Sequence, residues 1–150
     1  MKKKPVSKAI LEIMIKQLTE LEEQKTIVLD QYYAEPSSRR ANFENMLAKY
    51  KVHLDTYIKN AIVLDGISSD CPFVLIGSHV EVLDMEENES YTFRVVSPLI
   101  DETTSKVDCV SYLSPIGRAL LSKEVNDVFQ IETPSQLLNY KVSGIWLMDA

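Results

Sequence analysis

The chain has 150 residues, of which 45% are hydrophobic and 25% charged. This composition is typical of a globular protein, and the low content of 4 glycines and 6 prolines excludes collagen-like and low-complexity classes. The longest apolar run is too short to span a bilayer, and Glu12 and Lys16 interrupt the segment that would form a secretory core. Cys71 and Cys109 are too few for a disulfide framework. We therefore expect a cytoplasmic protein without membrane association.

Charge is distributed unevenly between the two halves of the chain. Residues 1–65 carry 11 Lys and Arg against 9 Asp and Glu, whereas residues 66–150 carry 5 against 13. The net charge of −6 argues against a protein that coats DNA, because such proteins need a basic face to neutralise phosphates. The asymmetry predicts two units with different partners.

The first half of the chain has the hydrophobic pattern of two helices. Seam residues alternate at spacings of three and four, with one polar interruption at Lys25, in the run Leu11, Met14, Leu18, Leu21, Lys25, Val28 and Tyr32. A second such run comprises Phe43, Leu47, Tyr50, Leu54, Tyr57 and Ala61. Ser7 is the expected N-cap of the first helix, and Pro36 is expected to end it. The short polar break between the runs predicts an antiparallel coiled-coil hairpin over residues 1–65.

The second half has the pattern of a sheet. Strands are predicted around residues 79–83, 91–95, 107–109, 129–131 and 140–146. Ser114 and Pro115 predict the start of a short helix, with Ser as its N-cap and Pro at its first position. Residues 73–150 are therefore expected to form an α+β domain, an antiparallel sheet packed on one helix. Residues 66–72, rich in Gly and Ser, form the expected linker.

A helical hairpin followed by such a sheet resembles the Gre-factor family of bacterial transcription elongation factors, the family of GreA and GreB. The most specific stretch is similar to the family's S-P-[IL]-[GA]-x-A-L-[LI]-G segment and reads Ser114-Pro115-Ile116-Gly117-Arg118-Ala119-Leu120-Leu121. Thr133-Pro134 resembles the family's turn before the last strand, and residues 60–65 resemble its ending of the second hairpin helix. The resemblance implies an FKBP-like fold for the sheet.

The same resemblance implies a monomer that binds bacterial RNA polymerase and meets nucleic acid within the elongation complex. In the family the hairpin enters the secondary channel, and the C-terminal domain docks at the rim. Ser114, Pro115, Ile116 and Gly117 correspond to the loop that meets the rim, where an exposed Ile116 beside a rigid proline is the expected anchor. The protein is not expected to be an enzyme or to hold a cofactor. Mg²⁺ would be held at the polymerase's own active centre, and cleavage of RNA would be the polymerase's own reaction.

The predicted hairpin tip departs from the family's pattern. Cleavage-active members carry a D-L-x-E-N-x-E-Y type motif, whereas residues 30–36 read D-Q-Y-Y-A-E-P. Asp30 matches the family's aspartate, Tyr33 stands where its first glutamate falls, and Glu35 is out of register. Because Mg²⁺ prefers carboxylate ligands, the nearby cations of Arg39 and Arg40 oppose metal-assisted cleavage. Asp30 and Glu35 are the candidate cleavage residues, and we expect weak or absent stimulation of cleavage.

Alternatives remain open for these features. An active cleavage factor using Asp30 and Glu35 is one, and a prolyl isomerase with an apolar pocket around Phe129 or Trp146 is another. A Rnk-type regulator is disfavoured by the length of the seams. Tyr33 is the tip tyrosine expected to contact a partner, since the other hairpin tyrosines fall on the seams. A solvated face is favoured over an RNA-binding patch for Lys16, Lys25, Lys49, Lys51 and Lys59.

Two smaller expectations concern single residues. The family usually has glycine where this chain has Ser122, Asn126 and Ser135, so some tight turns are expected to differ. His53 and His79 have no catalytic partner nearby in the sequence, and we expect no chemical role for either.

Overall fold

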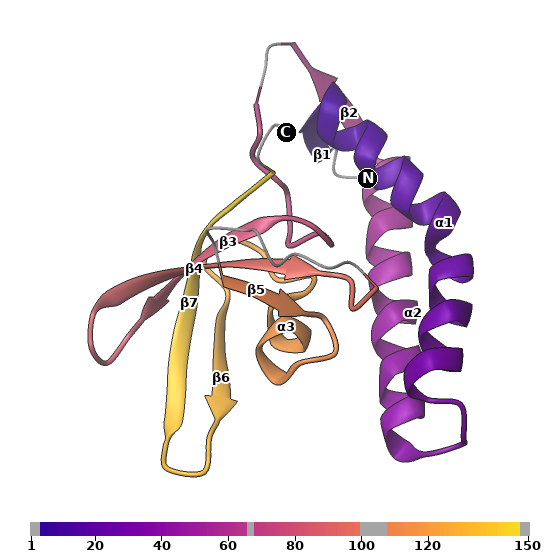
Figure 1. The fold of residues 1–150 in the computed structure, drawn as a ribbon. Coiled ribbons are helices and arrows are strands. Elements are labelled where there is room, and N and C mark those ends of the chain that lie inside the picture. The colour runs from indigo at the N-terminus through magenta and orange to yellow at the C-terminus, as the bar shows by residue number, and fades with distance from the viewer. Residues whose placement is uncertain (1–3, 66–67, 100–107, 148–150) are drawn as a thin grey trace. The chain divides into compact units, whose positions relative to one another are not determined.

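The computed structural model describes residues 4–65, 68–99 and 108–147. The chain divides into two compact units, residues 1–68 and 69–150 (Figure 1). Within the described residues, the first unit holds two long helices and a two-stranded sheet, and the second holds a five-stranded sheet and one short helix. This is the α+β fold expected from the sequence, a helical hairpin followed by a mostly antiparallel sheet.

The hairpin is formed by α1 (Lys8–Tyr32) and α2 (Ser38–Lys59), joined by residues 33–37. Ser7 caps α1 as predicted, because its Oγ accepts a hydrogen bond from the Ile10 N–H at 3.4 Å. Ser37 caps α2 in the same way, accepting from the Arg40 N–H at 3.0 Å. Pro36 lies between the two helices, where an extended backbone separates them.

The two helices meet along most of the predicted seam, although Ile10 is the buried residue at its start where the prediction had Leu11. Its buried side chains are Ile10, Met14, Leu21 and Val28 of α1 and Phe43, Leu47, Tyr50 and Leu54 of α2. The Tyr50 hydroxyl donates a hydrogen bond to Oε1 of Gln17, so a polar pair is satisfied inside the seam. Tyr32 is the exception, because its side chain is 49% exposed, and its placement on the seam was wrong. The ring that packs against α2 at this end is that of Tyr33, 5.6 Å from the Phe43 ring between centroids.

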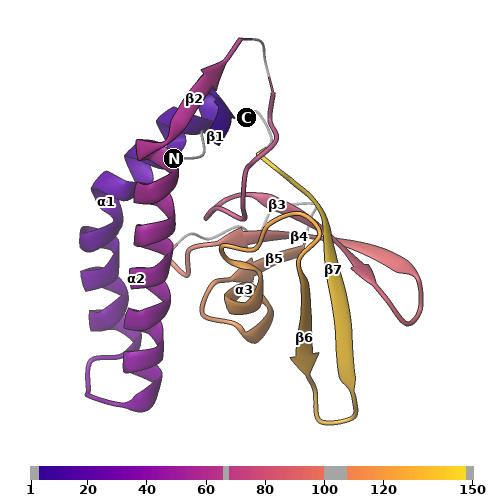
Figure 2. The same cartoon turned by 180° about the vertical axis from the view of Figure 1, so that it is seen from behind.

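A small parallel sheet lies at the opposite end of the hairpin from the tip (Figure 2). It pairs β1 (Lys4–Ser7) with β2 (Ala61–Leu64). The seam pattern placed Ala61 on the second helix, and the family resemblance placed the end of that helix at residues 60–65, but α2 ends at Lys59. β-Branched Ile62 and Val63 favour a strand over a helix, and β1 supplies the backbone partners. Strand formation therefore replaces the predicted last helical turn.

The second unit is built on five strands, in the spatial order β5-β4-β3-β7-β6. They are β3 (His79–Asp84), β4 (Glu89–Val96), β5 (Asp108–Ser111), β6 (Val128–Glu132) and β7 (Leu137–Trp146). Each strand lies where the sequence predicted one, although Val107 falls outside the described residues. The sheet is mostly antiparallel, as predicted, and among the described strands the one pair that differs is β4 with β5, which is parallel. Two parallel strands cannot be joined by the tight turn of a hairpin and need a longer connection.

The short helix α3 (Pro115–Leu120) contacts β4, β5 and β6. Below it lies a core of almost wholly inaccessible side chains: Phe73, Val74, Leu75, Val80, Val82, Val95, Tyr112, Leu120 and Val142. Each buried side chain of this size contributes roughly 1.5–3 kcal/mol to folding. The core thus fixes α3, and with it the loop that precedes the helix, on the sheet.

Ser122 and Asn126 occupy left-handed backbone positions, with φ of 73° and 80°. These are two of the sites where the family usually has glycine, and glycine adopts such a φ without steric cost. At these two turns the chain thus keeps the backbone geometry that glycine favours, with a serine and an asparagine in its place. Ser135, the third site, is not among the residues with positive φ.

His79 is buried in the sheet beside Trp146. The two rings are stacked, with centroids 5.8 Å apart, and within the described part of the chain His79 Nδ1 has no hydrogen-bond partner. Burial, and to a lesser extent the Arg94 cation, lowers the pKa of His79. The structure thus disfavours protonation of this histidine.

Stability should therefore fall in mild acid through His79. The pKa of His79 is lower in the folded protein than in the unfolded chain, where it is about 6.5. The folded state therefore has the full contribution of His79 to stability above pH of about 6.5, and this contribution is lost as the pH falls through the pKa of the folded state. His79→Phe keeps a ring beside Trp146 but cannot be protonated. Urea unfolding at pH 7.5 and pH 5 should show a larger loss of stability for the wild-type protein than for His79→Phe. Equal losses in both proteins would contradict this assignment.

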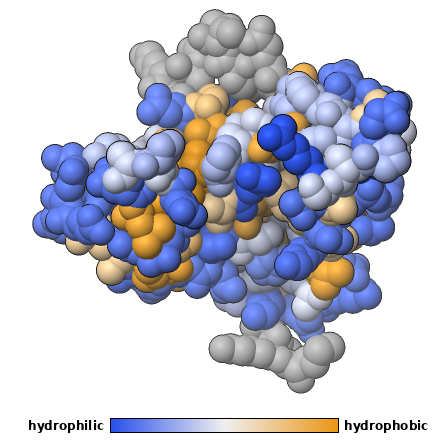
Figure 3. All heavy atoms as spheres, turned by 90° about the horizontal axis from the view of Figure 1, so that it is seen from below, coloured by the Kyte–Doolittle hydropathy of each residue, from blue (hydrophilic) through white to orange (hydrophobic). Residues whose placement is uncertain are grey.

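The face drawn in Figure 3 is mostly hydrophilic, with separate small hydrophobic patches. Exposed large apolar side chains include Val52, Met85 and Val125. Scattered apolar side chains of this kind are normal on protein surfaces. In the described ranges, none of the helices has the length and apolar character needed to cross a membrane.

Candidate functional site

The hairpin tip is a short, tightly held connection. The Tyr33 N–H donates to the Leu29 carbonyl at 2.9 Å and so closes the last turn of α1. At the start of α2, the Arg40 N–H donates to Ser37 Oγ at 3.0 Å, and the Ala41 N–H donates to the Ser37 carbonyl at 3.1 Å. The backbone of the tip is therefore anchored from both helices.

The tip carboxylates do not form a preassembled metal site. Asp30 and Glu35 are both exposed, Asp30 on the last turns of α1 and Glu35 in the connection. Among the described residues, no group of three His, Cys, Asp or Glu side chains is arranged to hold a metal ion. The tip therefore offers two solvated carboxylates of its own.

Tyr33 is less available than the sequence indicated. It is half-buried against Phe43, whereas Tyr32 has the more exposed ring. The two neighbours have thus exchanged the roles that the seam spacing assigned to them. Tyr33 remains a candidate contact through its exposed part, and Tyr32 joins it.

Arg40 makes contacts at the tip that the sequence did not predict. Its Nη1 donates to the carbonyls of Tyr33 and Ala34, each at 3.2 Å, and its Nε donates to Glu44 Oε1 at 3.1 Å. One side chain therefore links the end of α1, the connection and α2. A signal was present in the sequence, since a cation in the first turn of a helix opposes the helix dipole.

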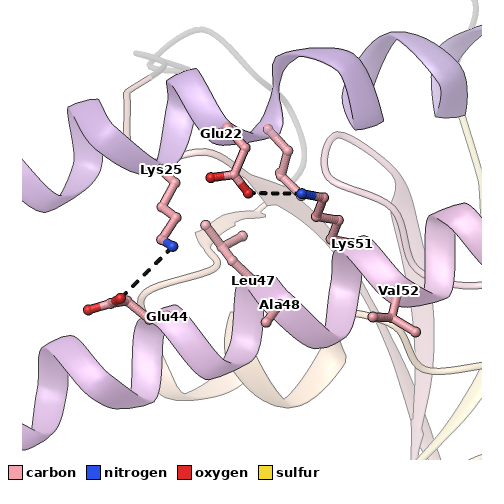
Figure 4. Close-up of a pocket in the computed structure, with 8 residues that line it drawn as sticks. Glu22, Lys25, Glu44, Leu47, Ala48, Lys51 and Val52 are labelled. Carbon is pink, nitrogen blue, oxygen red and sulfur yellow. Dashed lines mark hydrogen bonds and ion pairs between the residues drawn. The ribbon is translucent and has the colours of Figure 1, made fainter.

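Ion pairs cross a groove between the two helices, shown in Figure 4. The groove has a volume of about 370 Å³ and is lined by apolar side chains that include Leu21 and Leu47. Lys51 lies 3.1 Å from Glu22 across it, and Lys25 lies 3.9 Å from Glu44. The hydrogen bond from Lys51, together with its charge, lowers the pKa of the Glu22 carboxyl.

These pairs bear on the lysines considered as an RNA-binding patch. Lys25 and Lys51 face carboxylates across the hairpin, and Lys59 pairs with Asp55 at 2.9 Å. Pairing of this kind reduces the positive potential that phosphates would meet. The arrangement favours the ordinary solvated face expected from the sequence.

The loop before α3 is fixed by a network around Ser114. Its Oγ accepts from the Gly117 N–H at 3.1 Å, so Ser114 is the predicted N-cap, and Pro115 is the first helical residue. The same hydroxyl donates to the Ser111 carbonyl at 2.6 Å, and the Ser114 N–H donates to that carbonyl at 2.9 Å. A Cβ on Gly117 would lie 1.9 Å from the same oxygen, so this position admits no side chain without a shift.

The Ser114–Gly117 loop, which consists of the cap residue and the first turn of α3, presents Pro115 to solvent and holds Ile116 half-buried. The expectation of an exposed isoleucine anchor was thus correct only for part of the side chain. Pro115 is the more accessible of the two apolar residues. Together they form a small apolar surface on a rigid loop, next to exposed Arg118.

The aromatic residues named for a prolyl isomerase pack with separate neighbours. Phe129 lies 5.7 Å from Tyr140 between ring centroids and has the Lys123 ammonium over its face at 5.9 Å. Trp146 stacks on His79. Nothing in these contacts favours an isomerase pocket.

Comparison with known proteins assigns the family. Residues 69–147, just over half of the chain, match the family described as transcription elongation factor GreA/GreB, C-terminal part. The transcription elongation factor GreA of Buchnera aphidicola is 42% identical over 72 residues, which are 48% of this chain and 44% of that protein. GreA of Desulfotalea psychrophila is 31% identical over 102 residues, 68% of this chain and 62% of that protein. The chain thus matches less than two thirds of the length of either relative.

Two solved structures match nearly the full length of the chain at low identity. The prokaryotic transcription elongation factor GreA/GreB from Nitrosomonas europaea has a TM-score of 0.48 at 20% identity, over 97% of this chain and 99% of that one. Thermus aquaticus Gfh1 has a TM-score of 0.46 at 23% identity, with the same coverage. The family match over residues 69–147 includes the Ser114–Gly117 loop but not the hairpin tip. On that match, the chain belongs to the GreA/GreB family of transcription elongation factors.

Proposed function

We propose that this protein binds bacterial RNA polymerase and modulates elongation by inserting its hairpin into the secondary channel. Family membership supports the partner, and the intact hairpin supports the mode of action. At 1.5 Å per residue, the 25-residue α1 is about 37 Å long. A helical pair of this length is suited to a narrow channel, and the partner would include nucleic acid of the elongation complex. The protein would act in the cytoplasm as a monomer.

The tip chemistry supports a factor with weak or no stimulation of cleavage. Asp30 and Glu35 are exposed, Arg39 and Arg40 follow them within a few residues of the chain, and Tyr33 stands where the family has a glutamate. A second Mg²⁺ at the polymerase active centre needs negative charge and oxygen ligands from the tip. The protein would therefore occupy the channel without being an enzyme itself, and without a cofactor of its own.

The Ser114–Gly117 loop is the observation that carries the docking proposal. Its backbone is fixed by the Ser114 cap and by the close approach of Gly117 to Ser111, so its apolar residues are already ordered before binding. Ordering before association lowers the entropic cost of binding. Pro115 and Ile116 would contact the rim of the channel.

The function is tested with a backtracked elongation complex. Purified protein is added, and RNA length is followed with time, both with and without nucleotides. We expect slower nucleotide addition and little new cleavage. A protein that binds the complex and cleaves RNA rapidly would support the active-factor alternative, and one that does not bind would refute the proposed function.

Ile116→Asp should weaken polymerase binding by about 1 kcal/mol or more, because a charge replaces a contact that is dehydrated on docking. Since Ile116 is half-buried, Pro115→Asp is the companion variant. An acid at the first position of a helix is favourable, which preserves α3. Met85→Asp, at a 50% exposed apolar site in the turn after β3, is the matched control. If both loop variants bind the polymerase with unchanged affinity and unfold at the wild-type temperature, the loop serves only as a helix cap.

A further inference from the structure

The guanidinium of Arg40 is bound on two sides at the hairpin tip. On one side it donates to the carbonyls of Tyr33 and Ala34, and on the other to the Glu44 carboxylate. Glu44 also faces Lys25 of α1 at 3.9 Å. The side chains of Arg40 and Glu44 are 33% and 38% exposed, so water screens these contacts only in part. Arg40 therefore joins both helices and the connection in one network.

The position of Arg40 is unfavourable for its own helix and favourable for the preceding one. It lies in the first turn of α2, where the helix dipole favours acids, and that turn holds none. The last turn of α1 has no basic residue of its own, and its final carbonyls lack partners within the helix. Arg40 places a cation just beyond the end of α1 and donates to the carbonyls of Tyr33 and Ala34, the two residues that follow the helix. The contacts of Arg40 with these carbonyls therefore hold the shape of the tip and do not stabilise α2.

These contacts determine which side chains the tip presents. With its carbonyl bound by Arg40 and its amide by Leu29, Tyr33 turns its ring onto Phe43. Tyr32, Asp30 and Glu35 are left exposed. Arginine is suited to this task, because its planar fork serves several acceptors at fixed angles, which a lysine ammonium cannot reproduce.

We infer that Arg40 is the positioning residue of the tip, which holds the connection in the one shape that acts inside the polymerase channel. The inference rests on the proposed function and deepens it. Docking would depend on the Ser114–Gly117 loop, whereas the effect on nucleotide addition would depend on the ordered tip. Loss of Arg40 should therefore reduce the effect on nucleotide addition while polymerase binding is retained.

The test compares Arg40→Gln and Arg40→Lys with Arg39→Gln in the full-length protein. Arg39 is the matched control, since it is an exposed neighbour whose loss removes the same charge. For Arg40→Gln we expect amide exchange in residues 33–37 to accelerate about tenfold, as charge-assisted hydrogen bonds are lost. The maximal effect on nucleotide addition should fall about tenfold at saturation, with polymerase affinity within about twofold of wild type. Arg40→Lys should recover only part of the effect, and Arg39→Gln should resemble the wild type.

Each result has one meaning. A full effect of Arg40→Gln at saturation, or wild-type amide exchange at its tip, would overturn the inference. Equal losses in Arg39→Gln and Arg40→Gln would also overturn it, because charge alone would then account for the result. A wild-type protein that neither binds the polymerase nor alters elongation would refute the proposed function, while amide exchange would still report whether Arg40 orders the tip.

Discussion

Gly117→Ala should destabilise the sheet unit by about 3 kcal/mol or more, despite the higher helix propensity of alanine. The added Cβ would lie 1.9 Å from the Ser111 carbonyl oxygen and 2.6 Å from its carbon. Both are backbone atoms, and the oxygen is held by two donors of Ser114. Relief of the clash would therefore break the Ser114 network and displace either α3 or the end of β5. Urea unfolding, followed by circular dichroism, measures the loss.

Gly144→Ala is the matched control for this substitution. A Cβ at Gly144 would meet its nearest atom, a Trp146 ring carbon, at 3.6 Å, which is an ordinary contact. We expect a change within about 1 kcal/mol at this strand position. If Gly117→Ala is as mild as Gly144→Ala, the loop adapts easily, and the rigidity on which the docking proposal depends is absent.

The parts of the fold that depend on neighbouring residues could be predicted from the sequence. The spacing of Met14, Leu21 and Val28 specified the buried face of α1, since helical geometry alone brings these positions together. Ser114 and Pro115 specified the start of α3, because a cap requires only its own turn. The Ser-Pro segment also identified the family, and residues 69–147 match it.

The parts that depend on distant residues could not be predicted. Whether Ile62 and Val63 continue a helix or form β2 is decided by pairing with β1, more than fifty residues earlier in the chain. The parallel direction of β5 depends in the same way on its partner β4. At the tip, the positions of the Tyr33 ring and the Arg40 guanidinium depend on contacts across the turn, and the spacing of seam residues does not indicate such contacts. The assignment of the tip carboxylates as cleavage residues remains a prediction.

Tyr33→Glu should raise the stimulation of transcript cleavage by on the order of tenfold, the range typical of groups that tune a metal site. It places a carboxylate where the family's first glutamate falls and adds it to those of Asp30 and Glu35. The contacts that hold Tyr33 to Leu29 and Arg40 involve its backbone, so they survive the substitution, although packing on Phe43 is lost. The measurement is the rate of RNA shortening in a backtracked complex at saturating protein.

Tyr32→Glu separates position from charge in that experiment. It adds the same charge one residue earlier, at a side chain that is already 49% exposed. Tyr32 is the last residue of α1, whereas Tyr33 has a non-helical backbone and packs on Phe43, so the two side chains start from different places. A carboxylate at position 32 should therefore not reach the same metal, and little gain is expected. Equal gains from both variants would show that net charge alone limits cleavage. Rapid cleavage by the unmodified protein, abolished by Asp30→Ala, would show instead that Asp30 with Glu35 suffices, and that the Arg40 cation does not prevent metal binding at the tip.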